Sequence, residues 1–145
     1  MAVDTSRKAS SQATAMRGIA KIYLGDREDG LELLRTGLDL APEDPHRFRH
    51  LRELAIGLLL QGDVTEAMAV SDKLAHLAPD LLRNEVVAVP ILWLSGRHDE
   101  AKRRMDTLLS KHPTLCQATI RLNAIRDNDL ARRLTDALLS AGLPP

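Results

Sequence analysis

The sequence predicts an all-α fold in which helical hairpins stack side by side into an α-α superhelix. The composition favours it, because only three of the 145 residues are aromatic and Leu, Ala, Arg and Glu are good helix formers. A spacing of glycine and proline recurs along the chain, and apolar residues recur at steps of three and four residues, as on one face of a helix. The length indicates a single domain.

The recurring unit starts at a glycine, with steps of 37 and 34 residues between Gly25, Gly62 and Gly96. Each glycine is followed five positions later by a small residue and seventeen positions later by a proline. These residues are Gly30, Ala67 and Ala101, and Pro42, Pro79 and Pro113. Glycine just beyond a helix adopts the left-handed conformation easily, and proline cannot continue a helix interior. Each unit therefore predicts two helices joined at the glycine, with the small residue where they press closest.

The same signals place each predicted element. Helices are expected near 11–24, 28–40, 46–61, 64–77, 81–95, 98–111, 115–126 and 129–141, after a flexible N-terminal segment at 1–10. The domain at 11–145 then divides into repeats at about 11–45, 46–80 and 81–114 and a cap at 115–145. Pro90 lies inside the fifth helix, where it removes one backbone hydrogen bond and favours a kink.

The last predicted helix is amphipathic and suits a cap on the final hairpin. Its apolar side holds Leu130, Leu134, Ala137 and Leu138, and its polar side holds Arg132, Arg133 and Asp136. Residues 1–10 contain no comparable cap, which leaves the first hairpin partly bare and makes self-association a hypothesis.

The pattern of glycine, alanine and proline from 46 to 113 resembles the tetratricopeptide repeat. Gly18 and Ala55 occupy the family's small position in the first helix, which Val89 fills in the third unit. The first unit, 11–45, is similar but lacks the typical first-helix Trp and Tyr and carries Gly30 where Ala is usual. The resemblance implies a superhelix whose first helices line a concave, peptide-binding side.

A narrower resemblance begins at Asp44-Pro45-His46-Arg47-Phe48 and runs to the final Gly142-Leu143-Pro144. This region looks like the C-terminal tail of certain bacterial class III adenylate cyclases, although Ile125-Arg126-Asp127-Asn128-Asp129 stands where many of them have a Pro-rich link. It implies a docking or dimerising module of a signalling protein. No residue resembles the cyclase catalytic domain. A free-standing adaptor, or a protein like a secretion chaperone, fits the three repeats equally well.

The implied concave side predicts a site for a protein or peptide partner. Its apolar floor and arginine rim are expected to consist of Ile19, Tyr23, Arg49, Arg52, Ile56, Leu59, Arg83, Val86 and Trp93. Arginine and aromatic side chains are enriched among residues that dominate binding energy. Two alternatives stay open: Tyr23 and Trp93 fill the core between hairpins, or the groove is covered by residues 1–10 or by a second copy of the chain.

Charge and hydropathy argue against other partners. Twenty basic residues balance twenty acidic ones, so the chain lacks the positive charge that drives nucleic-acid binding. The longest apolar run, Val86 to Leu94, is nine residues, far short of the ~20 needed to cross a bilayer. The single cysteine, Cys116, excludes an internal disulfide, which together with the lack of a signal sequence suggests a cytoplasmic setting.

No pattern indicates an enzyme, a cofactor or a metal. His46 and His50 share a helix face, but spacing suggests no third ligand for a metal ion. The glycines are isolated rather than grouped in a phosphate-binding loop. We interpret Cys116 as a small core residue and the acidic residues as helix-terminal charges. The chain is therefore predicted to be non-catalytic.

If Ala67 and Ala101 lie at the hairpin crossings, replacing either by leucine should overpack the crossing. We expect Ala67→Leu and Ala101→Leu each to lower the free energy of unfolding by about 1–3 kcal/mol, measured by chemical denaturation. Wild-type stability in both variants would contradict the predicted register.

Overall fold

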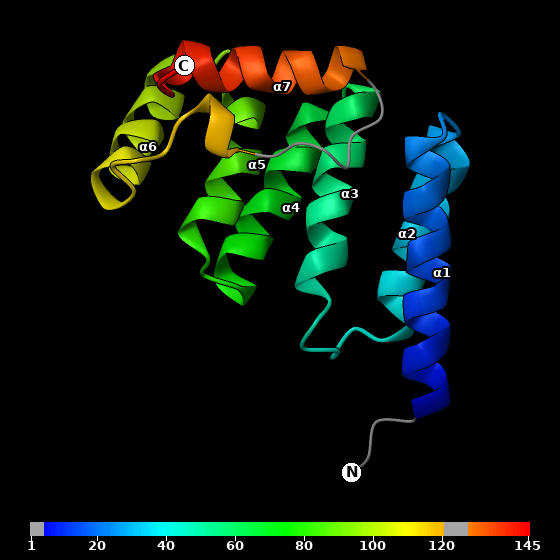
Figure 1. Ribbon diagram of the computed structural model, residues 1–145. Helices are drawn as coiled ribbons and strands as arrows, with labels where there is room; N and C mark the ends of the chain where they lie inside the picture. The colour runs from blue at the N-terminus through cyan, green and yellow to red at the C-terminus, as the bar shows by residue number, and fades with distance from the viewer. Residues whose placement is uncertain (1–4, 121–127) are drawn as a thin grey trace.

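The computed structural model describes residues 5–120 and 128–145, and within these ranges every regular element is helical (Figure 1). The elements are α1 (Thr5–Tyr23), α2 (Arg27–Leu40), α3 (Phe48–Gln61), α4 (Val64–Leu77), α5 (Leu81–Leu94), α6 (His98–Lys111), the 3₁₀ helix η1 (Gln117–Thr119) and α7 (Asn128–Ala141). The all-α class is confirmed for this part of the chain, and α2 to α6 begin and end within two residues of their predicted positions.

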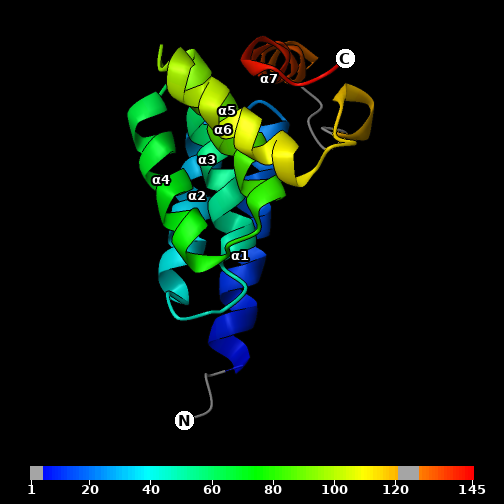
Figure 2. The same cartoon turned by 90° about the vertical axis from the view of Figure 1, so that its left-hand side faces the viewer.

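The helices pack as consecutive hairpins, α1 with α2, α3 with α4 and α5 with α6. The first helices also contact one another in succession, α1 with α3 and α3 with α5, so they form one layer of the molecule. Helix α7 lies crosswise to the hairpins in Figure 1, is seen nearly end-on in Figure 2, and packs on α5 and α6. The first helices thus share one face of the fold, and α7 closes its C-terminal end.

The predicted turns lie where the glycines stand. Gly25, Gly62 and Gly96 have φ of 96°, 82° and 83°, in the left-handed region. In the second hairpin, the N–H of Asp63 donates to the carbonyl of Leu58 at 3.0 Å, and the other two turns repeat this bond. The bond satisfies a carbonyl that the helix end leaves free. The same glycine closure follows α7 at Gly142, whose φ is 120°.

Close backbone contact joins α1 to α2. A Cβ atom at Gly18 would lie 2.6 Å from both the carbonyl oxygen of Gly30 and the backbone nitrogen of Leu34. One at Gly37 would lie 2.6 Å from the backbone nitrogen of Ala15. Because glycine has no side chain, the backbones of α1 and α2 can approach this closely.

The small residues of the other hairpins are buried as the repeat predicts. Ala67 and Ala101 are both 0% exposed, and Ala67 shares a core cluster with Ala55 of the neighbouring first helix. Val89 is also fully buried, so its extra bulk over alanine is accommodated within the third hairpin. Helix α5 continues through the buried Pro90 to Leu94.

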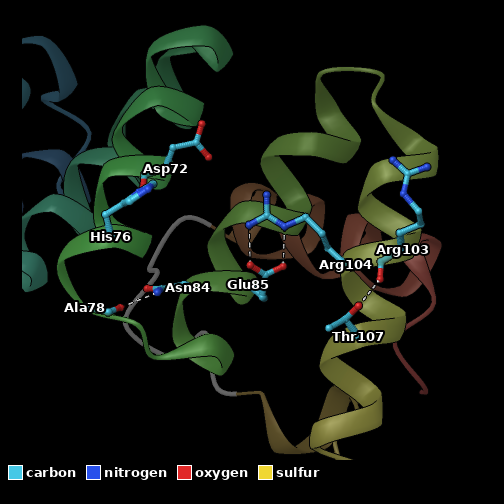
Figure 3. Close-up of polar contacts among 8 residues, drawn as sticks. All are labelled: Asp72, His76, Ala78, Asn84, Glu85, Arg103, Arg104 and Thr107. Atoms are coloured by element: carbon cyan, nitrogen blue, oxygen red, sulfur yellow. Dashed lines mark hydrogen bonds and ion pairs between the residues drawn. The ribbon is translucent and has the colours of Figure 1, made fainter.

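The third hairpin is joined by a buried ion pair, drawn in Figure 3. The Nε and Nη2 atoms of Arg104 on α6 donate to the two carboxylate oxygens of Glu85 on α5, at 2.8 and 2.6 Å. Glu85 is 5% exposed, so its charge depends on this partner. The amide of Asn84 donates to the carbonyl of Ala78 at 2.7 Å, which ties α5 to the end of α4.

Two sequence-based boundaries were wrong. Helix α1 begins at Thr5, so residues 5–10 are helical although a flexible segment was predicted at 1–10; residues 1–4 lie outside the described part. Polarity was mistaken for a lack of structure, because no helix breaker precedes Gly18. The first turns are also tied down, since Lys8 pairs with the buried Asp44 at 3.7 Å.

The helix predicted at 115–126 is also wrong where it can be seen. Residues 115–120 contain only the short η1, and the rest of that prediction falls on 121–127, outside the described residues. Leu115 is buried in the core. The Thr119 hydroxyl bonds to both the N–H and the carbonyl of Cys116, and such local side-chain bonds compete with helix formation.

Helix α7 has the predicted two faces. Leu134, Ala137 and Leu138 are buried, whereas Arg132, Arg133 and Asp136 are exposed; the side chain of Leu130 lies outside the described part. The helix packs on α5 and α6 rather than on a paired helix from 115–126.

The tight contact between α1 and α2 can be tested with alanine at two glycines. Gly18→Ala places a methyl group against backbone atoms, so we expect a net loss of about 1–2 kcal/mol after the gain in helix propensity. Gly57→Ala is the matched control, because the atoms nearest to its methyl group belong to the side chains of Leu31 and Ile22 rather than to backbone. Chemical denaturation that ranks Gly18→Ala at or above Gly57→Ala would contradict the close approach.

Candidate partner-binding groove

The layer of first helices lines a hollow of about 290 Å³, here called the central hollow. Its lining comes from α1, α3, α5, the segment 115–120 and α7, and consists of Tyr23, Arg52, Glu53, Ile56, Leu59, Leu82, Arg83, Val86, Val87, Leu115, Thr119, Ile120 and Leu134. The lining is mainly aliphatic with a few polar groups, the composition typical of ligand-binding pockets.

A second hollow of about 470 Å³, the N-terminal hollow, lies next to it and shares Glu53. The rest of its lining comes from α1 and from the start of the second hairpin, and consists of Gln12, Met16, Ile19, His46, Arg49 and His50. The two hollows follow the first helices from one hairpin to the next.

The structure brings together most of the predicted groove residues. Six of the nine line the central hollow: Tyr23, Arg52, Ile56, Leu59, Arg83 and Val86. Ile19 and Arg49 line the N-terminal hollow instead. Helical periodicity found these positions because the exposed faces of α1, α3 and α5 lie on the same side of one layer.

Trp93 is the exception, because it lines neither hollow. Its indole stacks on the imidazole of His98, with ring centroids 4.0 Å apart and planes 17° apart. The ammonium of Lys102 lies 5.9 Å from the same ring. The short turn from α5 to α6 brings these side chains to Trp93, so the indole packs within the third hairpin.

Sequence reasoning missed what covers the groove. Leu115, Thr119 and Ile120 line the central hollow together with residues of α5, and their segment crosses in front of that helix (Figure 1). The N–H of Gln117 donates to the carbonyl of Pro144 at 2.8 Å, which fastens the segment to the C-terminus. The chain itself thus bounds the hollow, where residues 1–10 or a second copy had been considered. No local pattern signals this contact, because it joins positions distant in sequence.

Tyr23 was predicted to line the groove and Glu53 was not, but the two side chains form a pair. The Tyr23 hydroxyl on α1 donates to the Glu53 carboxylate on α3. Burial and this contact raise the pKa of Tyr23 far above its usual value, so the hydroxyl stays protonated and keeps donating. A signal for Glu53 existed in its position beside Arg52 and four residues after Arg49 on one helix.

The two arginines of the central hollow differ in their partners. The Nε atom of Arg83 lies 3.6 Å from an oxygen of Asp80. By contrast, the Nε and Nη2 atoms of Arg52 are buried and have no hydrogen-bond partner among the described residues. Burial, together with the charge of Arg83, lowers the pKa of Arg52, but an arginine remains protonated at neutral pH.

Among residues 5–120 and 128–145, no group of three or more His, Cys, Asp and Glu side chains could hold a metal ion. His46 and His50 both line the N-terminal hollow, and burial lowers the pKa of His50. Cys116 is a free, partly exposed thiol, so it is less buried than the core position predicted for it.

No protein-family model and no curated protein matches this sequence. In the part of the chain that the structure describes, the helices are too short or too polar to span a membrane.

Arg104 has a carboxylate partner and Arg52 has none among the described residues, so replacing each of them should affect stability differently. Arg52→Met removes buried, unpaired donors and keeps the aliphatic stem, so we expect the free energy of unfolding to stay the same or rise by about 1 kcal/mol. Arg104→Met leaves the buried Glu85 carboxylate unpaired and should lower the free energy of unfolding by about 3 kcal/mol. Chemical denaturation of both variants measures these changes. If Arg52→Met loses as much stability as Arg104→Met, Arg52 has a partner in the folded chain.

Proposed function

We propose that this chain is a non-catalytic interaction module of the tetratricopeptide type, which binds a segment of a partner protein on the concave face of its first helices. The observation that carries the proposal is the central hollow, where three successive first helices contribute an apolar floor with charged groups at its edge. The resemblance of residues 46–113 to the repeat, and the matching turns of the three hairpins, support the same assignment.

The setting we propose is a cytoplasmic, bacterial signalling protein of the adenylate-cyclase kind, with this chain as its docking tail. The support is the resemblance from Asp44 to Pro144, and no residue here contributes cyclase chemistry. An adaptor that acts alone is the alternative. The genomic reading frame distinguishes them, because a catalytic domain encoded upstream in the same frame favours the tail and a start codon at Met1 favours the adaptor.

A second copy of the chain is the other candidate partner. Met16 and Leu24 on the first hairpin are 57% and 75% exposed, and large exposed apolar side chains favour association when they form a patch. Sedimentation over a dilution series separates this arrangement from binding of a different protein, because only self-association depends on the concentration of this chain alone.

A displayed library of random peptides tests partner binding directly. Selection against the wild-type chain should enrich a family of peptides that no longer bind Ile56→Glu, because a charge then occupies the apolar floor. Leu77→Glu is the matched control, since Leu77 is half exposed and lies outside both hollows, and it should bind normally.

The circular dichroism of both variants should match the wild type, which separates lost binding from lost folding. Failure to enrich any peptide family, or equal binding to Ile56→Glu and wild type, would overturn the groove as the site.

A further inference from the structure

One charged group in the central hollow lacks the partner that its chemistry requires. The Nε and Nη2 atoms of Arg52 each have less than 1 Å² of exposed surface and no hydrogen-bond partner among the described residues. Donors on a charged group cost free energy when they are buried without an acceptor. The hollow that Arg52 lines therefore favours a ligand that supplies an acceptor with negative charge.

The molecule itself shows what this edge of a guanidinium binds. Arg104 holds Glu85 through its Nε and Nη2 atoms, at 2.8 and 2.6 Å (Figure 3). Arg97 holds Glu100 through the same two atoms, which both donate to one carboxylate oxygen, at 3.0 and 2.5 Å. Two parallel hydrogen bonds to the two oxygens of a carboxylate match the geometry of this edge. The same edge of Arg52 has no carboxylate partner among the described residues and is covered in the unbound chain.

The lining of the hollow strengthens the preference for a negative group. Glu53 is the one acidic residue of the lining, and Tyr23 already donates to it. Arg83 adds a second positive charge, so the lining itself carries two positive charges against one negative charge, while Asp80, which pairs with Arg83 at 3.6 Å, lies outside the lining. Around these groups the walls are aliphatic, at Ile56 and Val86 for example, which suits an apolar neighbour of the carboxylate.

The position of the hollow indicates that the carboxylate belongs to a side chain. Glu53 lines both hollows, so a bound segment that follows the first helices extends from Arg52 into the N-terminal hollow. Such a segment reaches Arg52 with one of its side chains. The segment 115–120 bounds the central hollow, so the space holds one or two side chains rather than a long stretch of peptide.

We propose that Arg52 anchors the partner segment through an aspartate or glutamate side chain, with an apolar residue of that segment beside it against the aliphatic floor. The inference rests on the proposed function and specifies its partner as an acidic and apolar segment. Both nitrogens of Arg52 are covered in the unbound chain, so binding turns its guanidinium toward the hollow by rotation of a flexible side chain.

The test uses peptides from the display selection, synthesised with an acetylated N-terminus and an amidated C-terminus. Each is compared with a version whose acidic residue is replaced by its amide, Asp by Asn or Glu by Gln. On the wild-type chain this replacement should weaken binding about tenfold or more. On Arg52→Gln it should have almost no further effect, because the group that reads the carboxylate is gone.

Two more variants separate the geometry of the guanidinium from charge alone. Arg52→Lys keeps the positive charge but loses the two-pronged edge, so it should recover only part of the affinity. Arg103→Gln makes the same change of charge at an exposed position that points away from Glu85 and Arg104 in Figure 3, and it should bind like the wild type. Calorimetry gives the dissociation constants, and thermal unfolding confirms that each variant is folded.

The outcomes distinguish this inference from the proposed function. Peptides that enrich and fail to bind Ile56→Glu, but carry no conserved Asp or Glu, overturn the acidic anchor and leave the groove intact. The acidic anchor is also overturned if replacing the peptide's acidic residue by its amide weakens binding equally on the wild type and on Arg52→Gln, because another group then binds the carboxylate. Binding that disappears when the C-terminus is amidated assigns the carboxylate to a chain end instead. Failure to enrich any peptide removes the proposed function and this inference with it.

Discussion

The close contact of paired helices at positions with little or no side chain is the constraint on which the fold depends. Where Gly18 meets Gly30, an added Cβ would strike backbone atoms, and in the later hairpins Ala67 and Ala101 are completely buried. Because each second helix sits tightly against its first, the first helices remain free to contact one another as a layer. That layer is what places side chains from three hairpins around one hollow.

The end of the array determines the shape of that hollow. Among the described residues no fourth hairpin covers the third, and its apolar side chains pack instead with Leu115, Leu138 and Leu143 in a second core cluster. Helix α7 and the segment 115–120 therefore have two roles. They bury the face that the last hairpin would otherwise expose, and they close one side of the groove through Ile120 and Leu134.

The charged residues Glu85 on α5 and Arg52 on α3 differ in whether they have a partner. Glu85 is buried and paired with Arg104, so this ion pair joins α6 to α5. The Nε and Nη2 atoms of Arg52 are buried without such a partner among the described residues, which is a costly arrangement. Natural proteins tolerate unfavourable local interactions mainly at functional sites, and the contrast between the two arginines points to the central hollow.

The sequence by itself determined the features that depend on near neighbours. Glycines such as Gly62 end helices because only the local backbone must turn, and the three- and four-residue period of α3 placed Arg52, Ile56 and Leu59 on one face. The tertiary structure decided whatever depends on distant positions. Trp93 packs against His98 and does not line the groove. The segment 115–120 lines the central hollow and does not form the predicted long helix, and α1 begins at Thr5. Periodicity reports which side of a helix is apolar, but only packing reports what meets that side.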